Sequence, residues 1–325
     1  MDITAASEAA GSGSIPDGRK PCLHVQTPTV LSRPLSSLLG RDVYLKLENC
    51  QPTGSFKLRG IGALCAEAAA GGAKRFVSSS GGNAGLAAAY AGRELGIPTT
   101  VCVPEPTPDF IRDRLRGEGA EVIVRGQAWD DAHQAALEQV REKSAFYVHP
   151  FDHPAIWRGN STLVDELTSQ VPKPGLVVVA VGGGGLLCGV LEGLRRSGWG
   201  DVTVLACETE GTASFAAAFA AGKLVTLASV SGAATSLGAR TVTAKVLDWL
   251  KFPLRSFVAT DRAAVTSCLS FLDDHRFLVE PACGAALAAV YGKAVEPAAS
   301  GPVVVIVCGG AVVTRRKLEA LASGY

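Results

Sequence analysis

Two continuously apolar runs mark the second half of the chain, LVVVAVG at residues 176–182 and PVVVIVCGG at 302–310. Such runs predict strands that are covered on both faces, as in a parallel sheet flanked by helices. Six further β-rich runs are VYLKLE (43–48), RFVSSS (75–80), TTVCVP (99–104), EVIVRG (121–126), FYVHP (146–150) and VTVLACE (202–208). Helices are expected between them at 56–70, 83–96, 109–119, 129–143, 186–198 and 261–275. This alternation predicts an α/β protein with two layers and a cleft between them.

The composition excludes several classes of protein. Lys and Arg total 31 against 30 Asp and Glu, a formal net charge of +1, which gives no support for binding nucleic acid or an anionic membrane. Hydrophobic residues make up 47% of the 325 residues, enough for a large core. No apolar run reaches the roughly 18 residues of a membrane helix. The first twenty residues lack a secretory signal pattern and predict a flexible tail.

The nine cysteines show no C-x-x-C pair, and several stand inside apolar runs. This pattern favours reduced, buried thiols. Together with the absence of a signal pattern, it predicts a cytoplasmic protein.

Four consecutive glycines follow the strand at 176–182: Gly182, Gly183, Gly184 and Gly185. Glycines let a backbone approach a ligand closely, and the start of the next helix offers unpaired N–H groups. The segment therefore predicts an anion cup best suited to a phosphate. A tight turn would need only one or two glycines. The spacing up to Gly189, with Glu208 ending the next strand, also fits a dinucleotide fold, so an NAD-binding oxidoreductase stays as a distant alternative.

Lys57 lies in QPTGSFKLRG (51–60), after a turn and at the start of an apolar helix. Most lysines are solvated surface charges with a pKa near 10.4. A lysine that reacts as a free amine needs burial or a cationic neighbour to lower its pKa, and Arg59 is the nearest cation in the sequence. The segment makes Lys57 a candidate reactive lysine, with a surface charge as the alternative.

The segment SSSGGNAG (78–85) places three hydroxyls and two glycines before Asn83, which opens a helix. Hydroxyls, free N–H groups and an Asn cap suit a carboxylate ligand. An ordinary serine-rich helix cap is the alternative.

Six segments carry a resemblance to a known family: QPTGSFKLRG, SSGGNAG, GGGGLLCG, CETEGTASF, VEPACGAALAAVY and VVVIVCGG, in this order. The chain resembles the fold-type II pyridoxal phosphate (PLP) enzymes, most of all the short L-serine/L-threonine dehydratases of the liver type, from about residue 22 to 318. The resemblance implies a tryptophan synthase β-like fold with two open, twisted, mostly parallel sheets flanked by helices. It also implies a large PLP-binding domain, 21–72 plus 151–325, with a small domain inserted at 73–150.

The resemblance implies a role for each matching residue. Lys57 bonds to PLP, and Phe56 packs on its pyridine ring. Asn83 hydrogen-bonds the 3-hydroxyl of the ring, and Cys308 faces the pyridine nitrogen. The phosphate is bound by backbone N–H groups of Gly182, Gly183, Gly184, Gly185 and Leu186. The substrate carboxylate loop consists of Ser79, Ser80, Gly81, Asn83 and Ala84.

The resemblance also implies a site for a monovalent cation, K⁺ or another. Its ligands would be Glu208 and carbonyls near Gly182, Thr212, Leu237 and Ala239. Oxygen-only ligation suits a hard cation.

The implied reaction is β-elimination of a small hydroxyamino acid. L-Serine gives pyruvate and ammonia, and L-threonine gives 2-oxobutyrate and ammonia, with Lys57 as the base for the α-proton. The family implies a homodimer, and its short members lack a regulatory domain, so isoleucine should have no effect. Another fold-type II reaction, such as cysteine synthase-like β-replacement or threonine synthesis, stays open, as does an inactive amino-acid sensor.

Some residues depart from the family pattern. Gly81 stands where many dehydratases carry Ala and serine racemases carry Ser, which disfavours racemisation and predicts a looser fit around the substrate. Ser236 stands where relatives often place Ala, and Ala311 replaces an Asn that often follows the glycine pair. HPFDHP (149–154) could bind a metal through two histidines and an aspartate, but its prolines predict a loop. The four tryptophans are expected to serve packing.

Overall fold

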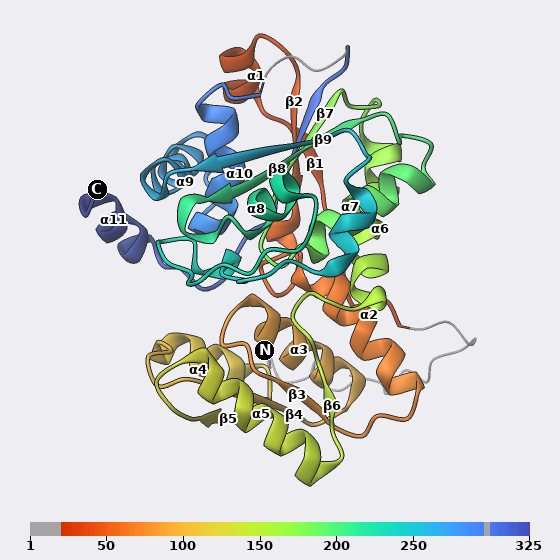
Figure 1. The fold of residues 1–325 in the computed structure, drawn as a ribbon, viewed down its shortest axis with the longest axis vertical. Coiled ribbons are helices and arrows are strands. Elements are labelled where there is room, and N and C mark those ends of the chain that lie inside the picture. Colours follow the sequence, from red (N-terminus) through yellow and green to blue (C-terminus); the bar gives the residue numbers. More distant parts are fainter. Residues whose placement is uncertain (1–20, 296–299) are drawn as a thin grey trace, which may run out of the picture.

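The computed structural model describes residues 21–295 and 300–325 (Figure 1). The expected tail at 1–20 lies outside the described residues. Two sheets form the frame, one above the other in Figure 1, with helix α2 (Lys57–Ala70) between them.

The larger sheet has six strands in the order β1-β2-β10-β7-β8-β9. Every neighbouring pair is parallel except β1 and β2. The strands are β1 (Thr29–Leu31), β2 (Val43–Leu47), β7 (Leu176–Ala180), β8 (Thr203–Thr209), β9 (Leu254–Ala259) and β10 (Val303–Val307). All five residues of β7 and of β10 are buried, which confirms the interpretation of the two apolar runs as strands covered on both faces.

The smaller sheet has four parallel strands in the order β5-β4-β3-β6. They are β3 (Phe76–Ser78), β4 (Thr99–Val103), β5 (Glu121–Val124) and β6 (Phe146–Tyr147). The expected fold class, with two mostly parallel sheets, is therefore confirmed. The domain boundaries remain a proposal, supported by the fact that each sheet draws on its own stretches of chain.

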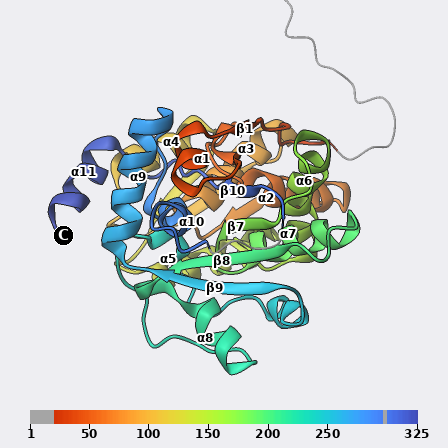
Figure 2. The same cartoon turned by 90° about the horizontal axis from the view of Figure 1, so that it is seen from above.

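Helices cover both faces of the larger sheet. Figure 2 shows the sheet running from β1 to β9, with α9 and α10 on one side and α6 and α7 on the other. The remaining helices are α1 (Arg33–Leu39), α3 (Asn83–Leu95), α4 (Asp109–Gly117), α5 (Trp129–Lys143), α6 (Pro154–Gln170), α7 (Gly185–Arg196), α8 (Ser214–Ala221), α9 (Asp261–His275), α10 (Pro281–Tyr291) and α11 (Arg315–Ser323).

Every strand and helix expected from the sequence is present, but several elements were missed. β1 has only three residues, and β9 is an edge strand with alternating burial. α10 is buried in ten of its eleven residues, so it shows no polar face. α6 begins at Pro154, which corrects the prediction that this proline belongs to a loop: proline is favoured in the first helical turn.

Two global expectations are testable on the described residues. No helix in the described ranges is long and apolar enough to cross a bilayer. All nine cysteines of the chain are described, and none forms a disulfide bond. Trp129 is the most exposed of the tryptophans, at 49%, and its ring stacks on that of His133 with 4.7 Å between ring centres.

Candidate active site

One cavity gathers residues from the carboxyl ends of parallel strands in both sheets. Asn83 follows β3, the glycine run follows β7, and Cys308 follows β10. Open α/β sheets bind their ligands at this edge. The cavity is also lined by Phe56, Lys57, Pro150, Phe151, Asn160, Ser236 and Glu280.

Lys57 begins α2 and points its amine at the start of the segment that leads to α6. Its Nζ donates a hydrogen bond to the carbonyl of Pro150 at 2.7 Å and lies 5.4 Å from the centre of the Phe56 ring. Burial lowers the pKa of Lys57 from 10.5 to about 8, although the carboxylate of Glu280, when ionised, would raise it. With this pKa, about one amine in ten is neutral at pH 7, far more than for a solvated lysine. Lys57 is therefore suited to react as a free amine.

The glycine run forms the start of α7. None of the backbone N–H groups of residues 182–187 donates a hydrogen bond within the described part of the chain. A Cβ on Gly183 would lie 2.3 Å from the Phe151 ring, one on Gly185 would lie 2.5 Å from the Phe151 carbonyl, and Gly184 has a φ of +87°. Packing alone thus requires three of these glycines, so the glycine count is not by itself a sign of a ligand. The unpaired N–H groups are the feature that suits a phosphate.

Asn83 opens α3 and is held on two sides. Its Oδ1 accepts from the backbone N–H of Ala311 at 2.9 Å, and its Nδ2 donates to Oε1 of Glu280 at 2.8 Å. One Nδ2 hydrogen is left over, because a side-chain amide has two. Asn83 lines the cavity, so this hydrogen is available to a ligand there.

Glu280 was not singled out from the sequence. It is 4% exposed, and its Oε2 has no hydrogen-bond partner within 3.5 Å among the described residues. Burial raises the pKa of Glu280 to about 7, although Ser236, Asn83 and Lys57 each lower it. The signal that could have found it is an acidic residue directly before a proline at a helix start, inside the quoted segment VEPACGAALAAVY. Asn160 was also missed; its Nδ2 donates to the carbonyl of Gly185 at 3.0 Å and ties α7 to α6.

Cys308 lies at the end of β10 and is 5% exposed. A hydrogen bond with Cys283 and burial raise the pKa of its thiol well above 9. The thiol therefore stays protonated at neutral pH. Its backbone carbonyl accepts from the N–H of Phe56 at 3.2 Å, which fixes the residue before Lys57.

The loop from Ser79 to Ala84 leads from β3 into α3. The N–H groups of Gly81, Asn83 and Ala84 donate no hydrogen bond among the described residues, as a carboxylate site would require. Ser79 is turned away from the cavity, with its hydroxyl bonded to Tyr147 and His133. Of the loop residues, only Asn83 lines the cavity.

The Glu208 side chain reaches the start of α8. Its two carboxylate oxygens accept from the N–H groups of Phe215 and Ala216, both at 2.7 Å. Burial raises the pKa of Glu208 to about 7. These bonds occupy the carboxylate that a dinucleotide ribose would need, which argues against the oxidoreductase alternative. Of the other expected cation ligands, the structure brings Gly182 against Leu237: a Cβ on Gly182 would lie 3.1 Å from the Leu237 Cα.

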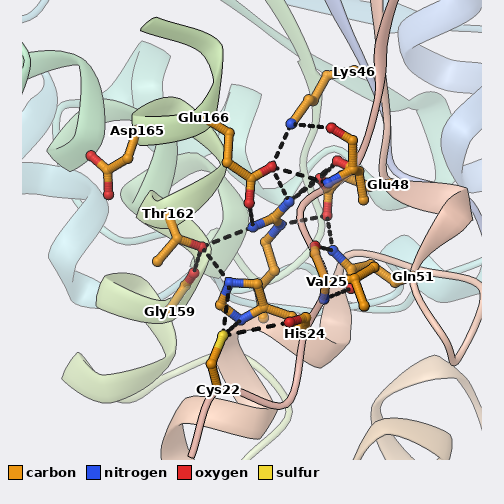
Figure 3. A network of polar contacts seen from close by, with 12 residues as sticks. Cys22, His24, Val25, Lys46, Glu48, Gln51, Gly159, Thr162, Asp165 and Glu166 are labelled. Carbon is orange, nitrogen blue, oxygen red and sulfur yellow. Dashed lines mark hydrogen bonds and ion pairs between the residues drawn. The ribbon is translucent and has the colours of Figure 1, made fainter. Parts of the chain in front are cut away.

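The sequence suggested that Arg59 could lower the pKa of Lys57, but the Arg59 side chain is bonded elsewhere. Its guanidinium bonds the two carboxylate oxygens of Glu48 at 2.7 Å each and those of Glu166 at 2.7 and 2.8 Å. Figure 3 shows Lys46, Glu48 and Glu166 converging on this point, and the Lys46 amine donates to Glu166 at 2.5 Å. Both cations and both carboxylates are matched, so the first turn of α2 is fixed to β2 and α6.

The histidines of HPFDHP serve the backbone. Nδ1 of His149 accepts from the N–H of Asp152 at 2.8 Å, and Nδ1 of His153 accepts from the N–H of Ala155 at 3.1 Å. No group of three or more metal-binding side chains occurs within the described ranges. The metal alternative therefore finds no support in the geometry.

Comparison with known proteins places this site in context. Residues 23–309 match the family described as "Pyridoxal-phosphate dependent enzyme". A human protein named "Serine dehydratase-like" is 49% identical over 308 residues, covering 92% of this chain and 94% of that protein. A mouse "L-serine dehydratase/L-threonine deaminase" is 49% identical over 312 residues, covering 92% and 95%.

Among solved structures, a fungal L-serine ammonia-lyase from Rhizomucor miehei superposes with a TM-score of 0.89 at 38% identity. The match covers 93% of this chain and 99% of that one.

Proposed function

Since the chain belongs to the family of pyridoxal-phosphate-dependent enzymes, we propose that it is an ammonia-lyase that acts on L-serine and L-threonine. L-Serine would be converted to pyruvate and ammonia, and L-threonine to 2-oxobutyrate and ammonia. The names of the mouse and fungal relatives support this choice among the reactions of the family.

The residues of the cavity fit the cofactor. The unpaired N–H groups at the start of α7 suit its phosphate, and the lowered pKa of Lys57 suits a bond to its aldehyde. The spare Nδ2 hydrogen of Asn83 suits its 3-oxygen. The neutral Cys308 thiol is a suitable neighbour for an uncharged pyridine nitrogen. We assign these residues to the cofactor on this basis.

PLP, when bound, accepts the electron pair that the α-carbon of the substrate retains after losing its proton. The residues of the chain supply the rest. Nζ of Lys57 takes the α-proton, and the Pro150 carbonyl accepts a hydrogen bond from the charged amine. The N–H groups of Gly81, Asn83 and Ala84 hold the carboxylate, which orients the α-proton toward Lys57. Loss of the β-hydroxyl and hydrolysis of the C–N bond give the oxo acid and ammonia, with no net use of water.

The proposal is carried by one observation: the amine of Lys57 has a lowered pKa and shares a cavity with the unpaired backbone donors of the glycine run. The test is the absorption spectrum of the purified protein with PLP, followed by addition of L-serine and an assay for pyruvate. We expect a long-wavelength band and pyruvate release. A band without pyruvate would favour β-replacement or an amino-acid sensor. No band would remove Lys57 from its proposed role.

A monovalent cation near Glu208 belongs to the same proposal. Glu208 is fully buried and forms no ion pair with any described residue, and the hydroxyl of Ser214, which directly precedes Phe215 in the chain, is buried without a partner in the same part of the structure. A hard cation would offset the charge of the Glu208 carboxylate and would be a partner for the Ser214 hydroxyl oxygen. We expect KCl to stabilise the protein more than tetramethylammonium chloride at equal ionic strength, and this difference should vanish in Glu208→Gln.

We also assign the protein to the cytoplasm and to a homodimer without a response to isoleucine. The free state of all nine cysteines supports a reducing compartment. The dimer rests on the family resemblance and is tested by light scattering of the purified protein. An effect of isoleucine on the initial rate would contradict the expected lack of response.

A further inference from the structure

Three polar groups meet behind the carboxylate loop, on the side away from the cavity. The hydroxyl of Ser79 lies 2.7 Å from the hydroxyl of Tyr147 and 3.2 Å from Nδ1 of His133. The same nitrogen lies 3.1 Å from the Tyr147 hydroxyl. The three residues come from the end of β3, the end of β6 and the second turn of α5, so the cluster joins three separate elements.

The direction of Ser79 follows from the pleat of β3. Val77 packs with Tyr147 and with alanines of α5, whereas Phe76 packs on the opposite face with residues of α2 and α3. Ser79 stands two residues after Val77 and therefore faces α5. It is 2% exposed, so its hydroxyl depends on Tyr147 and His133 for hydrogen bonds.

The protons of the cluster lock Ser79 in place. Ser79 and Tyr147 each bring one hydroxyl hydrogen, and Nδ1 of His133 either accepts or donates. Burial raises the pKa of Tyr147, so its hydroxyl remains a donor. The three approaches form a closed ring of contacts, and any rotation of the Ser79 side chain would break two of them.

Ser79 is the residue through which the chain enters the carboxylate loop. The loop is further braced from within, since the N–H of Gly82 donates to the Ser80 hydroxyl at 3.3 Å. The unpaired N–H groups of Gly81, Asn83 and Ala84 come directly after this point. Fixing Ser79 therefore limits where these donors can point.

We propose that Tyr147 and His133 are positioning residues that set the affinity of the site for the carboxylate of the substrate by holding Ser79. This inference rests on the proposed assignment of the carboxylate loop. The two residues touch neither substrate nor cofactor in this account. They act through the backbone donors that follow Ser79.

The segment that follows β6 also contacts Lys57, so the test must separate the two effects. The ring centres of Tyr147 and His149 are 6.2 Å apart, and those of His149 and Phe151 are 4.9 Å apart. Between them, the carbonyl of Pro150 accepts a hydrogen bond from Lys57. Tyr147→Phe removes the hydroxyl but keeps the ring and its contacts. Tyr291→Phe is the control, because it also removes a hydrogen-bonded tyrosine hydroxyl, which donates to Asp274 at 2.7 Å at the far end of α10.

The experiment is a titration of the cofactor band of the holoenzyme with L-alanine and with L-alaninamide. L-Alanine has no leaving group, so it reports binding without turnover. We expect Tyr147→Phe to weaken L-alanine binding about tenfold and L-alaninamide binding less than threefold, since loss of the hydroxyl releases Ser79 and loosens the backbone donors for the carboxylate, which L-alaninamide lacks. In the serine assay KM should rise about tenfold while kcat stays within about twofold. Tyr291→Phe should change neither ligand.

A second pair of variants tests His133 independently. An asparagine amide can take the place of Nδ1, so His133→Asn should bind L-alanine within about threefold of the wild type, whereas His133→Ala should behave like Tyr147→Phe. Unchanged L-alanine binding in Tyr147→Phe and His133→Ala would overturn the inference. So would equal weakening of L-alanine and L-alaninamide, or a fall in kcat at constant KM. Failure of the wild type to form pyruvate would contradict the proposed function alone, because the L-alanine titration would still decide this inference.

Discussion

Lys57 and Arg59 stand two residues apart on the first turn of α2, and their side chains end in opposite electrostatic surroundings. Arg59 is fully buried between two carboxylates, and the hydrogen bonds that it donates to Glu48 and Glu166 outweigh burial and raise the pKa of Arg59. Among the described residues, Lys57 has only a carbonyl as its hydrogen-bond partner, and burial lowers its pKa to about 8.

The surroundings of Glu166, beside Arg59, and of Glu280, in the cavity with Lys57, differ in the same way. Hydrogen bonds from Arg59 and Lys46 hold the pKa of Glu166 below its ordinary value, although burial raises it. Burial dominates at Glu280, whose pKa rises to about 7. The ion pairs of Arg59 hold one side of the first turn of α2 in place. Lys57, on the same turn, and Glu280 are not paired in this way, so they can exchange protons near neutral pH. The fold thus separates an anchor from a reactive site over a few residues.

The largest expected effect is the loss of turnover in Lys57→Ala. Removal of the proposed base should lower the rate of pyruvate formation about 10⁴-fold. The urea midpoint should stay the same or rise, because a partly buried amine with an unfavourable pKa is removed. Steady pyruvate formation by this variant would contradict the assignment.

Arg59→Met should break the anchor. It leaves two carboxylates and Lys46 without their central cation, and breaking a buried pair costs about 3–5 kcal/mol of unfolding free energy. Urea denaturation without cofactor measures it. Arg158→Met is the control, because Arg158 pairs with Glu67 at 54% and 40% side-chain exposure and should cost about 1 kcal/mol or less. Equal losses in the two variants would show that the network is no anchor.

Glu280→Gln and Glu166→Gln should shift the pH dependence of stability in opposite directions. A glutamate whose pKa rises from 4.5 to about 7 on folding destabilises the native state as pH increases through that range, by at most about 3 kcal/mol. Glu280→Gln should therefore match the wild type near pH 4.5 and exceed it at pH 7. Glu166, whose pKa is lowered, stabilises above its unfolded pKa of about 4.5 and loses this as pH falls. Glu166→Gln should therefore be less stable than the wild type at pH 7. A change of stability in the same direction for both variants at pH 7 would refute the comparison.

Gly81→Ala should have the smallest effect. A Cβ at this position would lie 3.1 Å from Val103 and 3.2 Å from Thr107, so it points into the small sheet region and requires a slight shift of both side chains. The methyl group should change kcat/KM for L-serine by no more than about fourfold. A tenfold change would show that the methyl group at residue 81 disturbs the substrate site and is not absorbed by Val103 and Thr107.

The sequence revealed the groups that lie in compact motifs. Lys57, Asn83 and the glycine run each sit at the end of a strand or the start of a helix, in short segments that single them out, and the family resemblance implies their roles. Glu280 escaped notice because its partner Asn83 is 197 residues away, and only the fold brings them together. The pairing of Arg59 with Glu166, 107 residues apart, and the turn of Ser79 toward His133 were hidden for the same reason. α10 was missed because an alanine-rich helix that is buried all round has no periodic pattern to read.

The central claim is that Lys57, and not one of the matched or exposed lysines, carries the cofactor. The direct measurement is borohydride reduction of the PLP-loaded protein, followed by proteolysis and mass spectrometry of the labelled peptide. The account predicts the pyridoxyl group on Lys57, with Lys46 unlabelled because Glu166, Gln170 and the Thr27 carbonyl occupy its amine. A label on Lys46 or on a surface lysine, with Lys57 unmodified, would contradict it.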